Sequence, residues 1–494
     1  MAGREPRSTT AAVARSHGSQ LTTLDAVSLR EGYAQRAFSP LEVVEAILAR
    51  IEELNPSVNA YVTVAGDLAR EQARLADRAY RQSDSVRPPL LGVPFSVKDT
   101  IATQGIRTTM GSRSLEHWVP TFDAPAVERC RRAGGVLLGK TNSPEFGWKG
   151  ETTNTLFGTT LNPWRLDRTP GGSSGGAAAA VALGMGPLAL GTDAAGSTRI
   201  PAAFCGIVGY KPSFGRIPMF PGGPLETLGH IGVLARSVRD VALMLEVTAG
   251  PDARDRLCLP GPVPAFRDAV EQRAAGLRAA WSPNLGFAAV DDEVLALAET
   301  AAQELPSLGW ELLELEAALD DPYPLLETLL AAGMAGAVRD TFESVRAQLD
   351  PERVPLIERG FALSGADVGA AIMARAHWVE GLRALVEPYD VLVTPSVPLE
   401  PFAAGISAPA LVGGRERPGL SWAGLSYPFN LSGQPAVSVP CGMTAEGLPV
   451  GLQIVGRTHD DMTVLSAAAA IEHARPWHDA WPALVGDGGR SGAA

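Results

Sequence analysis

Two short loops rich in glycine and serine are the first features of the sequence that could carry chemistry. One spans 171–176 and contains Ser173 and Ser174, and the other spans 191–199 and contains Ser197. Small residues let two backbones approach closely, so loops of this kind can bring hydroxyl groups together. A serine hydroxyl is a weak nucleophile until a neighbouring base takes its proton. The loops therefore predict a nucleophilic serine whose base lies elsewhere in the chain.

Lys98 is the candidate base. The chain has only four lysines, Lys98, Lys140, Lys149 and Lys211, and its other basic side chains besides histidine are arginines. Arginine does not lose its proton at ordinary pH, whereas burial can lower the pKa of a lysine towards neutrality. Lys98 ends an apolar run and precedes Asp99, so a surface ion pair is the simpler alternative.

The loop at 171–176 has two other interpretations. A phosphate-binding loop would need a Lys-Ser or Lys-Thr pair after its glycines, but Ala177 and Ala178 stand there. A flexible linker is disfavoured because apolar helical and strand patterns continue on both sides. Both interpretations lose weight beside the second serine loop and Lys98.

A serine–histidine mechanism is a further alternative within hydrolases. His230 is its best candidate, because His17, His473 and His478 lie near the ends of the chain. The sequence has no Cys-x-x-Cys or His-Glu-x-x-His spacing, so we expect neither a metal site nor a cofactor.

Taken together, these stretches resemble the amidase signature family of serine hydrolases. The resemblance rests on 90–100 (LLGVPFSVKDT) and 168–201 (RTPGGSSGGAAAAVALGMGPLALGTDAAGSTRIP), and it extends from about Leu21 to about His473. It implies a Ser–Ser–Lys triad in which Ser197 is the nucleophile, Ser173 relays protons and Lys98 is the base. A cis peptide bond between Gly172 and Ser173 is part of that implication.

The resemblance also assigns supporting roles within the two loops. The backbone N–H groups of Ala194, Ala195, Gly196 and Ser197 are the expected oxyanion hole, which stabilises charge on the substrate oxygen. Ala195 departs from the glycine of many members but still supplies an N–H. The polar residues Ser174, Asp193 and Arg199 are expected to brace the loops by hydrogen bonding. That they are ordinary loop residues and that they take part directly in catalysis are two alternatives of equal weight.

The elements that must position these residues follow from their patterns. A tightly packed helix is predicted over 177–183 and a buried strand over 186–191, which together would return the second serine loop to the first. Further buried strands are predicted at 90–98, 136–140 and 390–395, with helices at 67–81 and 125–133. A capping box at Ser39 begins a helix whose apolar positions run to Leu54, and Asn55-Pro56 is expected to end it.

This alternation of strands and helices predicts an α/β fold. The family resemblance implies a three-layer α/β/α domain with a large mixed, mostly parallel central sheet. We expect a disordered segment at 1–20, a single domain at 21–485 and a flexible tail at 486–494. Within the domain, core motifs occupy 90–212, variable helices at about 277–390 wall the substrate cleft, and closing strands lie at 390–456.

Composition limits the partners and the compartment. The 494-residue chain carries a formal net charge of −12, which argues against binding nucleic acid. Four scattered cysteines suit a reducing compartment, and there is neither a signal-peptide pattern nor a long apolar run. We therefore expect a cytoplasmic protein that acts on a small molecule without a membrane, and a homodimer is one option that the sequence leaves open.

The substrate class is the least constrained property. We expect an amidase for apolar or aryl amides, with carbamates as an extension, and Trp422, Leu425, Tyr427 and Phe429 suggest either an aromatic pocket or core packing. The alternative is the A subunit of a glutamine-dependent tRNA amidotransferase. That protein usually has Asn-Met-Asp-Glu-Phe where 142–146 read NSPEF, and its head-group aspartate falls at Ala423.

Overall fold

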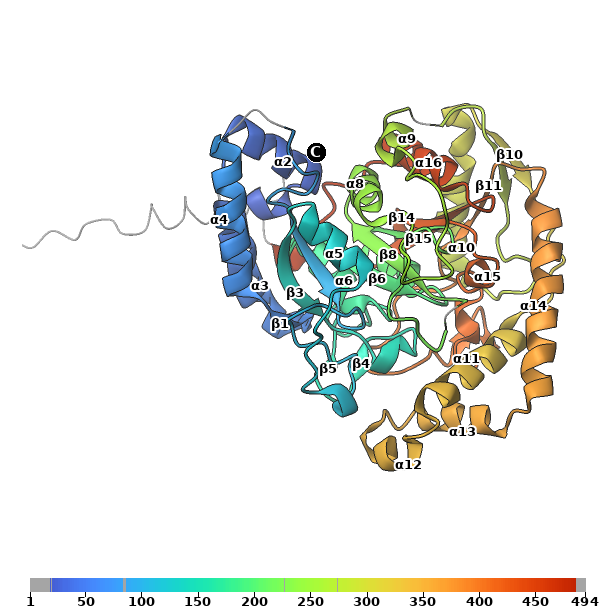
Figure 1. The fold of residues 1–494 in the computed structure, drawn as a ribbon. Helices are drawn as coiled ribbons and strands as arrows, with labels where there is room; N and C mark the ends of the chain where they lie inside the picture. Colours follow the sequence, from blue (N-terminus) through green and yellow to red (C-terminus); the bar gives the residue numbers. More distant parts are fainter. Residues whose placement is uncertain (1–17, 19, 83–85, 226, 273, 486–494) are drawn as a thin grey trace, which may run out of the picture.

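A computed structural model of the chain describes residues 18, 20–82, 86–225, 227–272 and 274–485 (Figure 1). The segments expected at 1–20 and 486–494 lie outside these residues, apart from Gly18 and Gln20. Within the described part, no helix has the length and apolar character needed to cross a bilayer.

An eleven-stranded sheet runs through the molecule and carries the candidate site. Its order is β1-β3-β2-β6-β8-β7-β14-β15-β11-β9-β10. Its members are β1 (Tyr61–Val64), β2 (Pro94–Lys98), β3 (Val136–Thr141), β6 (Leu188–Asp193), β7 (Val208–Lys211), β8 (His230–Ala235), β9 (Arg278–Trp281), β10 (Glu311–Glu314), β11 (Val391–Pro395), β14 (Ala436–Met443) and β15 (Pro449–Gly456). Two small hairpins lie apart from it, β4 (Thr153–Asn154) with β5 (Gly158–Thr159) and β12 (Leu411–Val412) with β13 (Arg415–Glu416).

The large mixed sheet is as expected, but the expectation that it is mostly parallel needs correction. Four neighbouring pairs are parallel, β3 with β2, β2 with β6, β11 with β9 and β9 with β10. The other six described pairs are antiparallel. Five of these antiparallel pairs are consecutive, from β6 to β11 in the middle of the sheet, and the sixth is β1 with β3 at its edge. In the middle, the short turn between β14 and β15 allows only antiparallel pairing of these two neighbours.

Helices cover both faces of the sheet, which gives three layers. Helices α5 (Pro125–Arg132), α8 (Val238–Thr248), α9 (Phe266–Gln272), α10 (Asp292–Gln303) and α16 (Asp461–Ala474) share one apolar core with the strands. On the other face, α6 (Gly175–Ala182) and α7 (Arg199–Cys205) pack on Ala189 and Leu234 through small residues. The close approach of α6 is possible because its buried side chains are almost all alanine.

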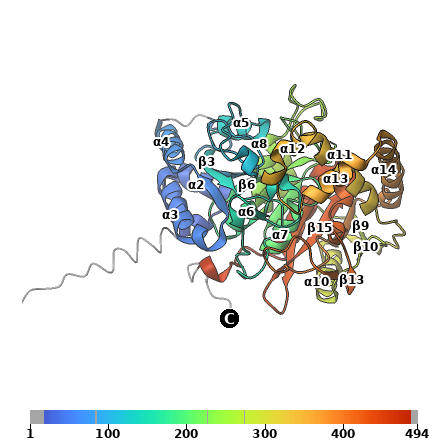
Figure 2. The ribbon, with the colours of Figure 1, turned by 90° about the horizontal axis from the view of Figure 1, so that it is seen from below.

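Two helical groups flank the ends of the sheet (Figures 1 and 2). Helices α2 (Ala26–Gln35), α3 (Pro40–Val58) and α4 (Gly66–Gln82) lie beside the β1 edge. Helices α11 (Tyr323–Val338), α12 (Phe342–Val345), α13 (Val354–Ala362) and α14 (Gly365–Val386) lie at the opposite end. The short helix α15 (Pro428–Leu431) and the 3-10 turns η1 (Arg113–Leu115), η2 (Glu145–Gly147), η3 (Leu305–Leu308), η4 (Arg346–Gln348), η5 (Ser421–Ala423) and η6 (Ala483–Val485) complete the described elements.

Helix α3 runs past the point where the sequence predicted its end. Pro56 lies inside the helix, which continues to Val58, and Asn59 ends it in the left-handed conformation. The Asn55 side chain accepts hydrogen bonds from the N–H groups of Ala60 and Tyr61 at 2.9 Å and 2.7 Å. A proline removes only one helical hydrogen bond so close to a C-terminus, so the turn after it decides where the helix ends.

The segment predicted at 277–390 as variable helices also contains two strands of the central sheet. β9 and β10 extend the sheet beyond β11, and both run parallel to their neighbours. Helix α10 ends at Gln303, and the 3-10 turn η3 follows from Leu305 with Pro306 in its first turn. The strands β9 and β10 were not predicted, because each has only four residues and β10 has the charged ends Glu311 and Glu314.

Candidate active site

Lys98 is the last residue of β2, and its side chain is completely buried. Its Nζ lies 2.6 Å from Ser173 Oγ and 2.8 Å from Thr192 Oγ1. Burial lowers the pKa of Lys98 to about 7, although the negative charge of Asp193 acts in the opposite direction. A large fraction of the amine is therefore uncharged near neutral pH, as a general base requires.

Ser173 lies at the N-terminal side of α6, and its hydroxyl is buried beside the lysine. The peptide bond between Gly172 and Ser173 is cis, in agreement with the family expectation. The backbone packs so closely here that a Cβ on Gly172 would lie 2.6 Å from backbone atoms of Glu151. A Cβ on Gly147 would lie 3.1 Å from Ser173 Oγ and 3.7 Å from Lys98 Nζ. The backbone of Gly147 therefore packs directly against both side chains.

Ser197 lies on the loop between β6 and α7, and its side chain is partly exposed. The Ser174 N–H donates to the Ser197 carbonyl at 3.1 Å and thereby ties the two serine loops together. Within the described part of the chain, the Ser197 hydroxyl makes no hydrogen bond. The structure thus brings Lys98 and Ser173 into direct contact and places Ser197 on the adjoining loop, without a hydrogen bond between the two serine hydroxyls.

A buried ion pair between Asp193 and Arg199 holds the Ser197 loop. Arg199 Nε and Nη2 lie 3.0 Å from the two carboxylate oxygens, and both side chains are completely buried. Burial alone would raise the pKa of Asp193, but the Arg199 charge and hydrogen bonds more than offset it and leave that pKa well below its usual range. Arg199 also donates to Asn430 Oδ1 at 2.7 Å and to Gln453 Oε1 at 2.8 Å.

Three further residues of this network were not singled out from the sequence. Thr192 accepts from Lys98, while Asn430 and Gln453 complete the shell around Arg199. Thr192 could have been found from its place next to Asp193 in the second loop. Asn430 and Gln453 lie more than 200 residues away from Arg199, and no local pattern marks them. Ser174 behaves as expected and bonds the Thr192 backbone at 3.2 Å and 3.3 Å.

The expected set of oxyanion donors needs one correction. The Gly196 N–H already donates to Asp193 Oδ1 at 2.7 Å, and the Thr198 N–H donates to Oδ2 at 3.2 Å. Gly196 is therefore not available as a donor to substrate, because the carboxylate that braces the loop occupies it. The N–H groups of Ala194, Ala195 and Ser197 make no hydrogen bond among the described residues and stay as candidates.

His230 does not contact a serine hydroxyl. It lies on β8 opposite Asp193, and its Nδ1 is 2.8 Å from the Leu228 carbonyl oxygen and 3.1 Å from that of Asp193. Its Nε2 is 3.3 Å from Lys211 Nζ. Both ring nitrogens therefore face groups other than serine, which removes His230, the best candidate of the serine–histidine alternative. The described residues also contain no group of side chains able to hold a metal ion.

Two adjoining cavities lead away from Ser197. The smaller is lined by Ser197, Ala194 and Ala195. It shares Trp148, Lys149, Gly150, Leu330 and Leu420 with a larger cavity of about 320 Å³. The larger cavity is lined otherwise by Tyr323, Glu327, Glu352, Pro355, Leu356, Arg359, Ser407, Ala408 and Gly419.

The predicted aromatic pocket is part of the core. Trp422, Leu425, Tyr427 and Phe429 are all buried, and none of them lines either cavity. Trp422 instead packs against Phe204 and Phe402. The core-packing alternative is therefore correct for this group. The cavity takes its apolar lining from Trp148, Leu420 and two of the cap helices, as we call α11 to α14.

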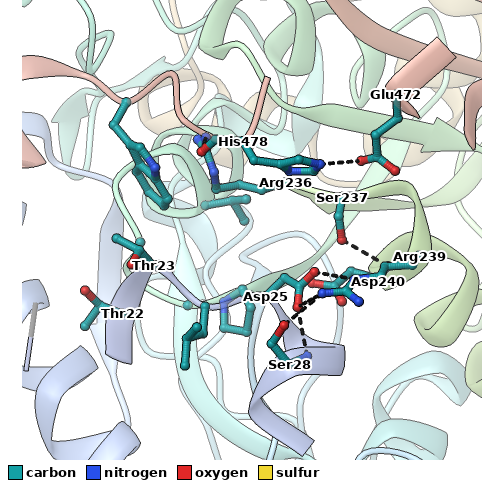
Figure 3. A pocket seen from close by; sticks show the side chains of 16 residues that line it. Thr22, Thr23, Asp25, Ser28, Arg236, Ser237, Arg239, Asp240, Glu472 and His478 are labelled. Carbon is teal, nitrogen blue, oxygen red and sulfur yellow. Dashed lines mark hydrogen bonds and ion pairs between the residues drawn. The ribbon is translucent and has the colours of Figure 1, made fainter. Parts of the chain in front are cut away.

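A separate cavity of about 300 Å³ lies near the opposite end of β6 (Figure 3). Its charged groups already have partners within the chain: Asp25 pairs with Arg239, and Asp240 accepts from the Ala26 and Val27 N–H groups. Glu472 lies 3.7 Å from His478 Nε2, and burial raises its pKa to about 7. This cavity lies between the start of α2 and the C-terminal end of α16, and the candidate serines do not line it.

Known proteins resemble this chain over nearly its full length. Residues 42–465 match the family model described as Amidase. An acylamidase of Rhodococcus erythropolis is 39% identical over 466 residues, covering 93% of this chain and 97% of that protein. The A subunit of the glutamyl-tRNA(Gln) amidotransferase of Roseiflexus castenholzii is 38% identical over 497 residues, covering 95% and 99%. The crystal structure of a bacterial aryl acylamidase aligns with a TM-score of 0.86 at 31% identity, covering 95% and 99%.

Proposed function

The chain belongs to the amidase signature family and is a hydrolase of carbon–nitrogen bonds, and from this premise we propose that it cleaves apolar or aryl amides as a stand-alone enzyme. The observation that carries this proposal is the cavity beside Ser197. Its lining includes the apolar side chains of Trp148, Leu330, Leu356 and Leu420. The resemblance to an acylamidase and to an aryl acylamidase supports the same class.

In the proposed mechanism, uncharged Lys98 accepts a proton from Ser173 while Ser173 accepts one from Ser197. The Ser197 oxygen forms a bond to the acyl carbon, and the negative charge on the substrate oxygen meets the N–H groups of Ala194, Ala195 and Ser197. The proton then returns through Ser173 to the leaving nitrogen as the carbon–nitrogen bond breaks. The 2.6 Å separation between Lys98 Nζ and Ser173 Oγ supports this route.

The acyl-enzyme is then hydrolysed along the same route. Water loses a proton through Ser173 to Lys98 as its oxygen attacks the acyl carbon. The ester bond to Ser197 breaks, Ser197 regains a proton, and a carboxylic acid leaves. Carbamates present a similar carbonyl and leaving nitrogen, so we include their cleavage as an extension of the proposal.

The alternative function is that of the amidotransferase component, which the similarity to the Roseiflexus castenholzii protein favours. Ala423 counts against it, because a buried methyl group stands where the resemblance expects the aspartate that holds an amino acid head group.

In the proposal the partner is a small molecule. A cytoplasmic location, a homodimer and the lack of nucleic-acid binding stay predictions.

The purified chain alone, assayed with an anilide, a carbamate and glutamine, distinguishes these functions. We expect hydrolysis of the anilide and little turnover of glutamine. Glutaminase activity that appears only when partner proteins are added, together with no anilide hydrolysis, would favour the amidotransferase component. Ser197→Ala is the control for hydrolysis by a contaminating enzyme.

A further inference from the structure

At one wall of the larger cavity, a lysine that lines it is surrounded by carboxyl groups, one of which also lines the cavity. Lys149 Nζ lies 3.2 Å from Glu352 Oε2, 3.5 Å from Asp350 Oδ2 and 3.8 Å from Glu151 Oε2. One ammonium group therefore faces three carboxyl groups. Lys149 also lines the smaller cavity with Ser197, so this wall is close to the candidate nucleophile.

The neighbouring charges do not remove this excess. Arg353 pairs with Glu145 at 3.3 Å, and Arg359 pairs with Glu327. Among the charged side chains that line the cavity, Lys149 and Arg359 balance Glu327 and Glu352. The excess of carboxyl groups comes from Asp350 and Glu151, which lie behind the lining and share Lys149 with Glu352.

Glu352 is the member of this group that a substrate can reach. Its side chain is 56% exposed, against 7% for Lys149 and 7% for Asp350, and it lines the cavity. Oε2 accepts hydrogen bonds from Lys149 and Ser407. Oε1 accepts none within the described part of the chain. The buried Lys149 thus orients the carboxylate, and one oxygen of it stays free.

We propose that Glu352, held by Lys149 and Ser407, selects substrates by the charge of the end remote from the scissile bond, favouring a cationic end over a neutral one and disfavouring an anionic one. This inference rests on the proposed function, because it concerns the same cavity. Its physical basis is Coulombic: a fixed carboxylate attracts an ammonium group and repels a second carboxylate. Glu352 acts on specificity and takes no part in the bond changes.

The test uses 4-nitroanilides of equal length whose acyl chains end in a methyl, a trimethylammonium or a carboxylate group, and a second series with the same groups on the aniline. In one of the two series the charged end occupies the cavity. In that series we expect the wild-type kcat/KM to be highest for the cationic substrate, lower for the neutral one and lowest for the anionic one. Glu352→Gln should lower the cationic-to-neutral ratio about fivefold, the scale of an exposed ion pair. Lys149→Met should raise that ratio, because it removes the one ammonium group at this wall.

Glu343→Gln is the matched control, since it removes an exposed carboxylate from the same cap region without touching the cavity. Salt at about 0.5 M should reduce the wild-type ratio and leave neutral substrates nearly unaffected. Equal ratios in wild type and Glu352→Gln, with the neutral anilides still hydrolysed, would overturn the inference but not the proposed function. If no anilide is hydrolysed at all, the proposed function fails first.

Discussion

Lys98 Nζ and Ser173 Oγ lie 2.6 Å apart at the junction of β2 and the first serine loop, and both side chains are buried. Burial makes the amine easier to deprotonate, and the short distance lets it accept a proton from the Ser173 hydroxyl. This relationship leads to the first three predictions. The first two separate the base from the relay and the nucleophile, and the third concerns the residue that orients the base.

The pH dependence of the reaction should follow Lys98. Because the uncharged amine is the active form, kcat/KM should rise with pH through about 7 and level off above it. Lys98→Met should lower kcat by roughly 10²–10⁴-fold, the usual contribution of a general base. Lys98→Arg should not restore activity, since arginine keeps its proton. A pH profile that is flat across neutrality would contradict the assignment.

Ser197 and Ser173 should differ in covalent chemistry. Ser197→Ala should abolish labelling by a fluorophosphonate probe, because it removes the nucleophile. Ser173→Ala should still be labelled, but far more slowly, and it should lower kcat by roughly 10²–10⁴-fold. Intact-mass spectrometry over time measures both effects. Ser307→Ala, at an exposed serine outside the site, is the control. Normal labelling of Ser197→Ala would exclude Ser197 as the nucleophile.

Thr192 should orient the amine of Lys98. Its Oγ1 lies 2.8 Å from Nζ, so it can take one N–H of the uncharged amine and leave the lone pair facing Ser173. Thr192→Val should lower kcat/KM about tenfold, within the range of one lost hydrogen bond between neutral groups. It should also move the acid limb to lower pH, because a bond to the charged form is lost. Thr192→Ser should restore both, and a shift in KM alone would argue for a merely structural role.

The ion pair between Asp193 and Arg199 should dominate the stability of the nucleophile loop. Arg199→Met leaves a buried carboxylate without its cation, which costs about 3–5 kcal/mol of unfolding free energy. Urea denaturation measures this. Arg239→Met breaks the pair with Asp25, in which Arg239 is 45% exposed, and should cost no more than about 1 kcal/mol. Equal losses of unfolding free energy in Arg199→Met and Arg239→Met would show that burial does not set the contribution of these ion pairs to stability.

Glu472 should make stability depend on pH. Its folded-state pKa of about 7 lies above the ordinary value of 4.5, so between these values the folded chain binds more protons than the unfolded chain. Stability from this group should therefore fall as pH rises through that window. Glu472→Gln should be more stable than wild type above the window and show a weaker pH dependence in thermal unfolding. Glu299→Gln, exposed on α10, is the control, and an unchanged profile in Glu472→Gln would contradict the prediction.

The sequence alone determined the parts of this protein that depend on local pattern. Capping at Ser39, the apolar strand that ends in Lys98 and the alanine-rich helix after the first serine loop all lie where their residues predicted. The resemblance to the family was carried by continuous motifs, so it could be recognised without a structure. Core packing of Trp422 and its neighbours, one of the two interpretations offered for them, could also be predicted from their residue types.

Only the tertiary structure decided relations between residues that are distant in sequence. The partners of Arg199 at Asn430 and Gln453, the use of the Gly196 N–H by Asp193, and the carboxylates around Lys149 all depend on how separate segments meet. The antiparallel pairs in the middle of the sheet and the strands β9 and β10 were decided in the same way, because neighbouring segments fix the direction of a strand and the pairing of short strands. Local residue patterns encode torsion preferences and burial, whereas the charge environment of a buried group is a sum over the whole fold.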